Sequence, residues 1–350
     1  MDLSTRYLGL DLRNPLVASA SPLSNTVDGV RRLADAGVGA VVLYSLFEEQ
    51  LRHEAAQNAA LADVGTESFA ESLSYFPSEA EADPGPRRYL SLVERAVAAV
   101  DVPVIASLNG TSLGGWTDYA RALAEAGAAA IELNIYYPPG GPPPGSPSAS
   151  LAGSLSPFFP AWDVEQRHVE VLTTVKAVVE VPVAVKLSPY FSSTGDMALR
   201  LDQAGADGLV LFNRFLQPDI DPETLTVTAG FGLSSPAEAR LPRAWIALLA
   251  GRVSASLAAT TGVEDAADVA RYLLAGADVV MTASALLRHG AGHAATLLDG
   301  LSGWMARKDF AAVAEFRGLL SVPADADQAA YERAGYVTVM QAANQGHGPW

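Results

Sequence analysis

Three asparagines and one lysine stand at the ends of apolar segments that have the composition of buried β-strands. Asn109 follows VPVIASL, Asn134 follows AAAIEL, Asn213 follows LVLF and Lys186 follows VPVAV. Alone, an asparagine in such a place is more often a turn former, and a lysine is more often a solvated charge. Four of them, each after an apolar strand, indicate a polar site that the strand ends build together.

Two later turns add a different chemistry. The segments AATTGV and TASALL place Thr261, Gly262, Ala283 and Ser284 where a strand passes into a helix. Backbone N–H groups there, with the two hydroxyls, predict an anion cradle, and ordinary helix capping is the competing interpretation. A phosphate cradle beside amides and a lysine suits flavin mononucleotide (FMN), because an ammonium near N1 and O2 stabilises the negative charge of reduced flavin.

A repeat shows which elements must position these residues. Four segments share one pattern, in which a helix end and an Ala-Gly turn precede an apolar strand: LADAGVGAVVLYS, LAEAGAAAIELNI, LDQAGADGLVLFN and LLAGADVVMTAS. Gly37, Gly127, Gly205 and Gly276 fit the left-handed position that ends a helix. We interpret them as helix ends rather than phosphate-binding loops.

Eight apolar segments alternate with amphipathic ones, which predicts an α/β fold with a parallel, helix-covered sheet. The strands are expected near residues 16–20, 40–45, 102–108, 129–135, 182–188, 207–213, 253–259 and 277–283. Eight such units close most economically as a (β/α)8 TIM barrel, with an open doubly wound sheet as the alternative. We expect one domain over residues 1–350, with the barrel over about 14–300 and closing helices over about 301–350.

Three connections are too long for simple loops: roughly 46–90, 137–165 and 214–243. Each follows a strand and would therefore lie on the catalytic face of a barrel. The middle one is rich in proline and glycine, so we expect an extended, stiff lid rather than a helix.

Bulk composition narrows the class of protein. The formal charge of −16 disfavours nucleic-acid binding and docking on anionic membranes. The chain has no cysteine, which excludes disulfides and thiolate chemistry. No signal peptide or membrane span is recognisable, so we expect a cytoplasmic protein that forms a homodimer and acts on a small molecule. His289 and His293 are four residues apart without an acidic third ligand in the sequence nearby, so no metal site is expected.

The strand ends resemble the dihydroorotate dehydrogenase family, specifically its diverged dihydroorotate dehydrogenase-like branch. The resemblance covers about residues 5–300 and is carried by NPLVASASPLS, YSLFEEQ, ASLNGTSLGGWTDYARALAEAGAAAIELNIYY, VPVAVKLSPYF, LVLFNRFLQPDID, SLAATTGV and VVMTASALLRHG. It implies an FMN-dependent oxidoreductase of CH–CH bonds, of the kind found in pyrimidine metabolism.

The resemblance also implies roles for individual residues. Ala18 and Ser19 would line the flavin ring, with Ser45 among the cofactor-binding residues, and Asn109 and Asn134 would reach the ring edge and the ribityl region. Lys186 would contact N1 and O2, and Asn213 would face the substrate. The phosphate would be held by Thr261, Gly262, Ala283 and Ser284.

The chain departs from the family pattern at the fourth strand, which in the family ends Asn-x-Ser-Cys-Pro-Asn. Here Tyr137 stands at the position of the base and Pro139 at that of a substrate-binding asparagine, while Tyr44 replaces a flavin-contacting lysine and is assigned to the substrate. A phenol, with a pKa of about 10 against about 8.5 for a thiol, is the poorer base but a competent acid. We therefore predict hydride transfer from flavin to a polarised C=C of a small cyclic amide, imide or related acid, with Tyr137 or Tyr136 as proton donor.

Two alternatives stay open from the sequence. One is a flavin-free, phosphate-binding lyase or isomerase that uses Lys186 as a base or Schiff-base amine. The other is a non-catalytic relative that binds FMN or supplies a barrel to an electron-transfer complex.

Overall fold

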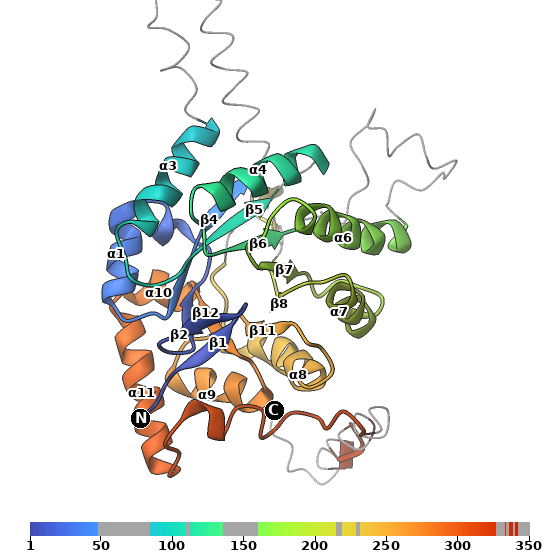
Figure 1. Cartoon of the computed structure of the whole chain (residues 1–350). Coiled ribbons are helices and arrows are strands. Elements are labelled where there is room, and N and C mark those ends of the chain that lie inside the picture. The colour runs from blue at the N-terminus through green and yellow to red at the C-terminus, as the bar shows by residue number, and fades with distance from the viewer. Residues whose placement is uncertain are drawn as a thin grey trace, which may run out of the picture.

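Eight parallel strands close into a barrel in a computed structural model (Figure 1), in the order β11-β12-β3-β4-β5-β6-β7-β8. The structure describes residues 1–47, 85–109, 113–135, 160–214, 219–228 and 232–326, with 333, 336–338 and 340–341 near the C-terminus. The barrel strands are β3 (Leu16–Ala18), β4 (Ala40–Phe47), β5 (Val104–Asn109), β6 (Ala130–Asn134), β7 (Val183–Leu187), β8 (Gly208–Leu211), β11 (Ser256–Ala259) and β12 (Val279–Thr282). The predicted (β/α)8 barrel is confirmed, and the open doubly wound sheet is wrong.

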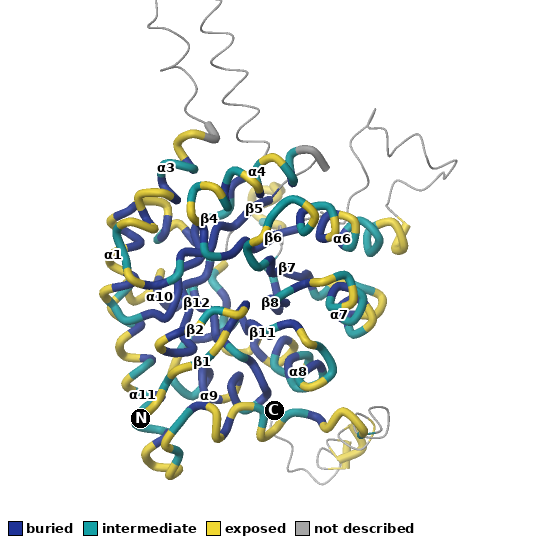
Figure 2. Tube along the Cα trace, in the orientation of Figure 1, coloured by how far each residue is buried: buried dark blue, intermediate teal, exposed yellow. Residues whose placement is uncertain are grey.

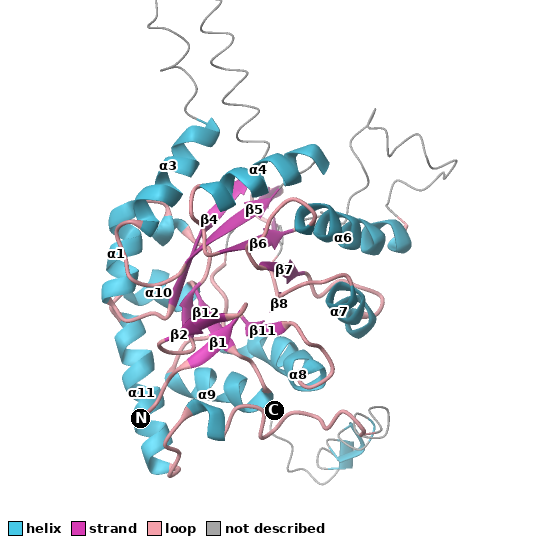
Figure 3. Ribbon diagram, in the orientation of Figure 1, coloured by secondary structure: helices cyan, strands magenta, loops and turns pink. Residues whose placement is uncertain are grey.

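Helices surround the barrel on its outside (Figure 3). They are α1 (Val27–Asp35), α3 (Gly85–Val97), α4 (Leu113–Glu125), α6 (Ala161–Lys176), α7 (Thr194–Gln203), α8 (Arg240–Leu249), α9 (Ala266–Ala275), α10 (Ser284–His289) and α11 (His293–Arg307), with short 3-10 turns η1 (Pro22–Ser24), η3 (Pro236–Ala239) and η4 (Val313–Glu315). Of the closing helices expected over about 301–350, the described residues show the end of α11, the short η4 and helical residues at 333, 336–338 and 340–341, and the rest of 327–350 lies outside the described residues. Within the described ranges, no helix combines the length and the apolar character that crossing a membrane requires.

The predicted helix-ending glycines have the backbone that their position requires. Gly37, Gly127, Gly205 and Gly276 have φ of +99°, +93°, +92° and +115°. At Gly276 a side chain would also collide with Ala250, because an added Cβ would lie 2.5 Å from Ala250 Cβ. The Ala-Gly turns therefore end each helix and start the next strand without strain.

An N-terminal hairpin that the sequence analysis did not predict closes the floor of the barrel. It consists of β1 (Thr5–Tyr7) and β2 (Leu10–Leu12), and it lies across the strands in Figure 1. Tyr7 and Leu8 are buried against small inward-facing residues of the barrel strands: Ala40, Ala130, Ala184 and Ala258. Gly208 is also needed there, because an added Cβ would lie 2.5 Å from Leu8 Cδ2. The small residues leave the space that the hairpin fills.

The long connections differ in what the structure describes. A second hairpin, β9 (Asp219–Asp221) and β10 (Thr226–Thr228), forms part of the predicted 214–243 connection and is largely exposed. The 46–90 connection and the proline-rich 137–165 segment lie largely outside the described residues, so the predicted lid stays a prediction.

The barrel strands are buried along most of their length (Figure 2), and their side chains alternate between two packed layers. One set of side chains, which includes Leu16, Val41, Leu43 and Ile131, packs between the barrel and its helices. The other set points into the barrel, where Val42, Ile105, Val210 and Met281 meet the N-terminal hairpin. The floor of the barrel is thus largely apolar, with Ser256 Oγ accepting from the Leu8 N–H of the hairpin, and the charged and amide side chains that face inward lie toward the carboxyl ends of the strands.

A buried histidine in α6 predicts how stability depends on pH. Burial lowers the pKa of His168 to about 4, and its Nδ1 lies 2.7 Å from the Val164 carbonyl oxygen. The unfolded chain, with an ordinary histidine pKa, binds more protons between about pH 6.5 and pH 4, so stability falls as the pH drops through this range. From pH 8 to pH 5 this residue should cost about 2 kcal/mol.

The variant His168→Gln keeps a hydrogen-bond donor but cannot titrate. Urea unfolding at a series of pH values should show a flatter acid limb for this variant than for the wild type. An acid limb of unchanged slope would show that His168 does not contribute to it.

Candidate active site

Polar side chains gather at the carboxyl ends of the barrel strands, where barrel enzymes carry their active sites. The strand register sets Asn134 beside Lys186, and Asn109 lies one step beyond the pair Leu108–Leu133. Three of the four polar residues that opened the sequence analysis therefore lie on adjacent strands. The fourth, Asn213, follows β8, and its backbone N–H donates to the Leu187 carbonyl at the end of β7.

A buried ion pair lies beneath this group. Lys186 Nζ is 3.3 Å from Glu132 Oε1, and the two side chains are 9% and 1% exposed. Glu132 is one inward-facing position deeper on β6 than Asn134. Because the ammonium has three donors and one contact within the described part of the chain, two N–H groups are left for a ligand. Schiff-base chemistry requires a free amine, whereas this lysine is engaged by a buried carboxylate.

The three asparagines differ in how many of their amide hydrogen-bonding groups are already bonded within the protein. Asn213 Nδ2 donates to Asn134 Oδ1 over 2.7 Å, which fixes both amides and leaves the Asn134 Nδ2 group as a donor. Asn109 is buried, and its Nδ2 atom has no hydrogen-bond partner in the structure. A buried donor without an acceptor costs about 1–3 kcal/mol, so Asn109 fits a ligand that brings an acceptor.

The second strand places its two predicted residues on opposite sides of the barrel wall. The Ser45 hydroxyl lies 2.8 Å from that of Ser107, an inward-facing residue of β5. The Tyr44 ring packs edge-on against Tyr89 of the outer helix α3, with ring centroids 5.1 Å apart. The expectation that Tyr44 faces the substrate is therefore not supported, because the register of β4 against β5 shifts between Val42 and Ser45, and this bulge directs the Tyr44 ring toward α3.

The first strand contributes less than the resemblance implies. Ser19 follows β3 and is buried, and its N–H donates to the Thr282 carbonyl. The Ala18 side chain belongs to the layer between the barrel and its helices, together with Leu16. Any contact of Ala18 with a ligand inside the barrel would therefore come from its backbone.

The predicted phosphate-binding turns are joined by a residue that the sequence analysis missed. Ser234 Oγ accepts from the Gly262 N–H over 3.1 Å and donates to Ser284 Oγ over 2.9 Å. Its own N–H also donates to Ser284 Oγ, so both acceptor positions of Ser284 are used and its O–H is left to donate. The turns at Gly262 and Ser284 therefore meet at one point.

Neither hydroxyl in these turns caps a helix. The N-cap of α9 is Asp265, and that of α10 is Ala283, so the capping interpretation is wrong. Thr261 Oγ1 donates to the Phe212 carbonyl over 3.1 Å, which uses the hydroxyl proton that we had assigned to the cradle. Thr261 has φ of +82°, an uncommon value for threonine, and the Tyr272 hydroxyl holds its carbonyl at 2.7 Å.

A tyrosine from the floor of the barrel reaches toward the ion pair from below. The Tyr7 hydroxyl is buried without a partner, as is Glu132 Oε2. Burial raises the pKa of Tyr7 well above its usual value, and the Glu132 carboxylate raises it further. The phenol therefore stays neutral beneath the site.

Other predicted features lie elsewhere. Tyr136, Tyr137 and Pro139 are outside the described residues, so their predicted roles remain predictions. The paired histidines do have an acidic neighbour in the folded protein, although none is close in the sequence: His289 Nε2 lies 2.7 Å from Glu264 Oε1. Still, within the described ranges no group of three or more His, Asp or Glu side chains is arranged to hold a metal ion.

Two residues of this site escaped the sequence analysis for different reasons. Glu132 is the single charge inside the apolar segment AAAIELN, and a charge in a buried strand is a usable signal. Ser234 lies in GLSSPAEA, where Ser235 and Glu238 form a capping box that starts η3. That motif predicts a helix start, but its proximity to Gly262 depends on tertiary structure.

The barrel, the polar ring at its strand ends and the buried lysine define the class of βα-barrel proteins with a ligand site at the carboxyl ends of the strands. The family model described as dihydroorotate dehydrogenase matches residues 2–305, and the chain belongs to that family.

Individual relatives support the same assignment. The chain is 32% identical over 193 residues to "Dihydroorotate dehydrogenase B (NAD(+)), catalytic subunit" of Halalkalibacterium halodurans, a match of 54% of this chain and 59% of the relative. The protein of the same name from Methanothermobacter thermautotrophicus is 27% identical over 322 residues, 91% of this chain and 98% of the relative. The first match thus spans less than two thirds of its relative, and the second nearly all.

The ion pair predicts a large coupling between Glu132 and Lys186. Glu132→Gln or Lys186→Met alone leaves one buried charge unpaired and should cost about 3–5 kcal/mol of unfolding free energy. The double variant should cost clearly less than the sum of the two. Urea unfolding of the four proteins measures this coupling.

A matched control is available at the opposite end of the barrel. Lys176 pairs with Asp207 at 2.6 Å, but both side chains are about one third exposed (30% and 34%). Lys176→Met should cost only about 1 kcal/mol. Additive effects of Glu132→Gln and Lys186→Met would contradict the coupling.

Proposed function

We propose that this chain is an FMN-dependent oxidoreductase that transfers hydride between the flavin and a carbon–carbon bond of a small cyclic amide, imide or related acid. The observation that carries the proposal is the buried Lys186–Glu132 pair beneath a ring of strand-end amides. Family membership and the names of the relatives support it.

The residues at the strand ends fit FMN by the donors that they leave open. Lys186 has two free N–H groups, Asn109 has a buried Nδ2 without an acceptor, and the Ser284 hydroxyl has a proton to donate. A flavin has carbonyl and ring-nitrogen acceptors at one end and a phosphate at the other. We assign Asn109, Asn134 and Lys186 to the ring, and the Gly262 and Ser284 turns to the phosphate.

When bound, FMN supplies hydride transfer. The protein supplies a fixed positive charge at Lys186, and Glu132 holds this ammonium in place from below. Because Glu132 neutralises Lys186, the charge that the site presents is smaller than that of an isolated lysine. The apolar floor, which includes Val42, Ile105 and Met281, keeps water away from the pair.

For the proton, we assign Tyr137 as the donor, with Tyr136 as the second candidate. Tyr137 follows Asn134 by three residues in the sequence, at the position where the family carries its base. A phenol is suited to donate a proton to a carbon that accepts hydride, which favours reduction of a C=C bond. The proposed class of substrates includes dihydroorotate and related rings.

The flavin-free alternative is less well supported. It requires Lys186 to act as a base or an amine nucleophile, whereas Lys186 Nζ is engaged in a buried ion pair, 3.3 Å from Glu132 Oε1. The relatives are named catalytic subunits, so a partner chain that exchanges electrons with this one is part of the proposal, as is a homodimer.

The first prediction concerns the cofactor. The purified protein should contain FMN, or take it up when added, at one FMN per chain, and should then show a flavin absorption spectrum. Lys186→Met should weaken FMN binding by about ten- to a hundredfold, the effect of one or two hydrogen bonds from a charged donor. Fluorescence titration of the apoprotein with FMN measures this change.

Lys176→Met serves as the control, because Lys176 pairs with Asp207 at the opposite end of the barrel from the carboxyl ends of the strands. This variant should leave FMN affinity unchanged. A protein that neither contains FMN nor binds it when added would refute the proposed function.

The second prediction concerns proton transfer. In the loaded enzyme, Tyr137→Phe should slow re-oxidation of photoreduced flavin by an unsaturated substrate about a hundredfold or more, because it removes the proton donor. Flavin affinity should not change. Stopped-flow absorbance separates the two effects, with Tyr136→Phe as the matched variant. If Tyr137→Phe reacts as fast as wild type and Tyr136→Phe is slowed instead, the donor is Tyr136.

A further inference from the structure

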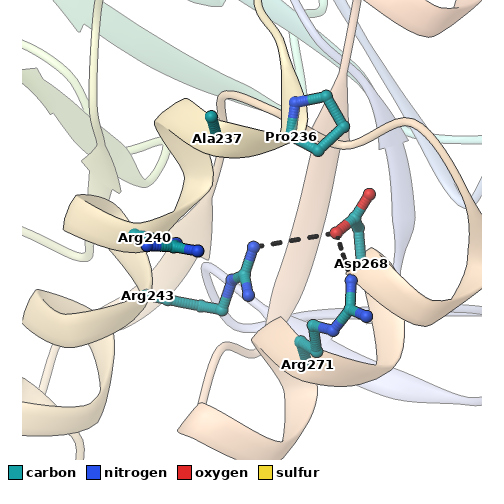
Figure 4. Close-up of a pocket in the computed structure, with 6 residues that line it drawn as sticks. All are labelled: Pro236, Ala237, Arg240, Arg243, Asp268 and Arg271. Atoms are coloured by element: carbon teal, nitrogen blue, oxygen red, sulfur yellow. Dashed lines mark hydrogen bonds and ion pairs between the residues drawn. The ribbon is translucent and has the colours of Figure 1, made fainter. Parts of the chain in front are cut away.

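A cationic cavity lies on the outside of the barrel, between α8 and α9 (Figure 4). It has a volume of about 290 Å³ and is lined by Pro236, Ala237, Arg240, Arg243, Asp268 and Arg271. The arginines come from two helices, and the proline and alanine belong to η3. The cavity is therefore separate from the inward-facing ring of strand-end residues.

The cavity has an excess of positive charge. Three guanidinium groups and one carboxylate leave two positive charges, in a chain whose formal charge is −16. Neighbouring acids are engaged elsewhere: Glu238 pairs with Arg214 and Glu264 with Arg288. These two carboxylates therefore do not balance the charge of the cavity.

Asp268 is already saturated with donors. It is 1% exposed and accepts from Arg271 Nη1 at 2.8 Å, while Arg243 Nη2 lies at 3.7 Å. Its second oxygen accepts from the backbone N–H groups of Glu264 and Asp265. Asp268 therefore positions two of the arginines and has little capacity for the third.

Hydrogen-bond donors remain unused around the cavity. Arg243 Nε is buried and has no partner in the structure. Arg240 is exposed and has no hydrogen bond or ion pair with any described residue, and Figure 4 shows it beside Arg243 without a contact to Asp268. These unused donors suit a hydrogen-bond acceptor, and the excess positive charge of the cavity favours an acceptor that is an anion.

We propose that this cavity binds the phosphate group of a small molecule. Guanidinium groups pair with phosphate through two parallel N–H···O bonds, and donors from several directions suit a tetrahedral dianion better than a planar carboxylate. The exposed sides of Arg240 and Arg271 leave the cavity open, so a phosphate ester fits as well as the free ion.

The cavity is also connected to the turn at Thr261. The Arg243 guanidinium lies 5.5 Å from the centre of the Tyr272 ring, and the Tyr272 hydroxyl donates to the Thr261 carbonyl. Pro236 and Ala237 are two and three residues after Ser234, which bonds Gly262 and Ser284. The inferred site and the proposed cofactor-phosphate turns therefore share supporting residues but not ligand atoms.

Calorimetric titration with inorganic phosphate at constant ionic strength tests the proposal, without FMN and with saturating FMN. We expect saturable binding that persists with FMN, is weakened about tenfold or more by Arg240→Gln, and is lost in Arg240→Gln/Arg271→Gln. Both arginines are exposed, so the variants should fold. Competition by glucose 6-phosphate distinguishes an ester-binding site from one for free phosphate, and either result supports the site.

Arg31→Gln is the matched control, because Arg31 pairs with Asp28 three residues away on α1, as Arg271 does with Asp268, at a similar exposure of 56% against 52%. It should leave phosphate binding unchanged. Binding that is insensitive to Arg240 and Arg271, or absent altogether, would overturn the proposal. If the chain takes up no FMN, the arginine dependence still decides the question, so failure of the proposed function and failure of this site are separate results.

Discussion

The buried pair of Lys186 and Glu132 is the interaction on which the arrangement of the site depends. Two charges with exposed fractions of 9% and 1% are tolerated only if each compensates the other. Glu132 lies one layer below Lys186 and balances its charge. Tyr7 of the N-terminal hairpin lies below Glu132 and adds no second charge, because burial raises the pKa of its phenol and keeps it protonated. The position of the lysine ammonium at the strand ends thus follows from residues on β6, β7 and β1.

This constraint explains why the barrel changes character along its axis. The lower inward-facing layer consists of small residues such as Ala130 and Ala184, which make room for the hairpin. Two residues further along the same strands stand Glu132 and Lys186, and the amide of Asn134 follows on β6. Because side chains alternate across a strand, each strand can supply an apolar floor and a polar rim from the same face. A one-residue slip would exchange these residues for ones that belong against the helices.

The sequence predicted the barrel well because its periodic signals are local. Ala-Gly turns and apolar runs located the eight strands, and the glycines have the expected backbone. The hairpin floor was missed, since its short strands lack a distinctive pattern and are defined by the space that Gly208 and the alanines leave. The same local signals placed Asn109, Asn134 and Lys186 at the ends of adjacent strands, whereas their roles stay predictions. Ser234 was missed and the orientation of Tyr44 was not foreseen, because the first depends on a distant turn and the second on a bulge in β4 between Val42 and Ser45.

The same physical argument separates the two charged regions of the molecule. Inside the barrel, one lysine is balanced by one glutamate, so the charge available to a ligand is small and its position is fixed. Between α8 and α9, three arginines line a cavity with one saturated aspartate, and the excess charge is available to a bound anion. The first arrangement suits tuning a neutral ring that gains charge during a reaction. The second suits binding a group that is charged from the start, which is why we place a phosphate outside the barrel wall as well as at the strand ends.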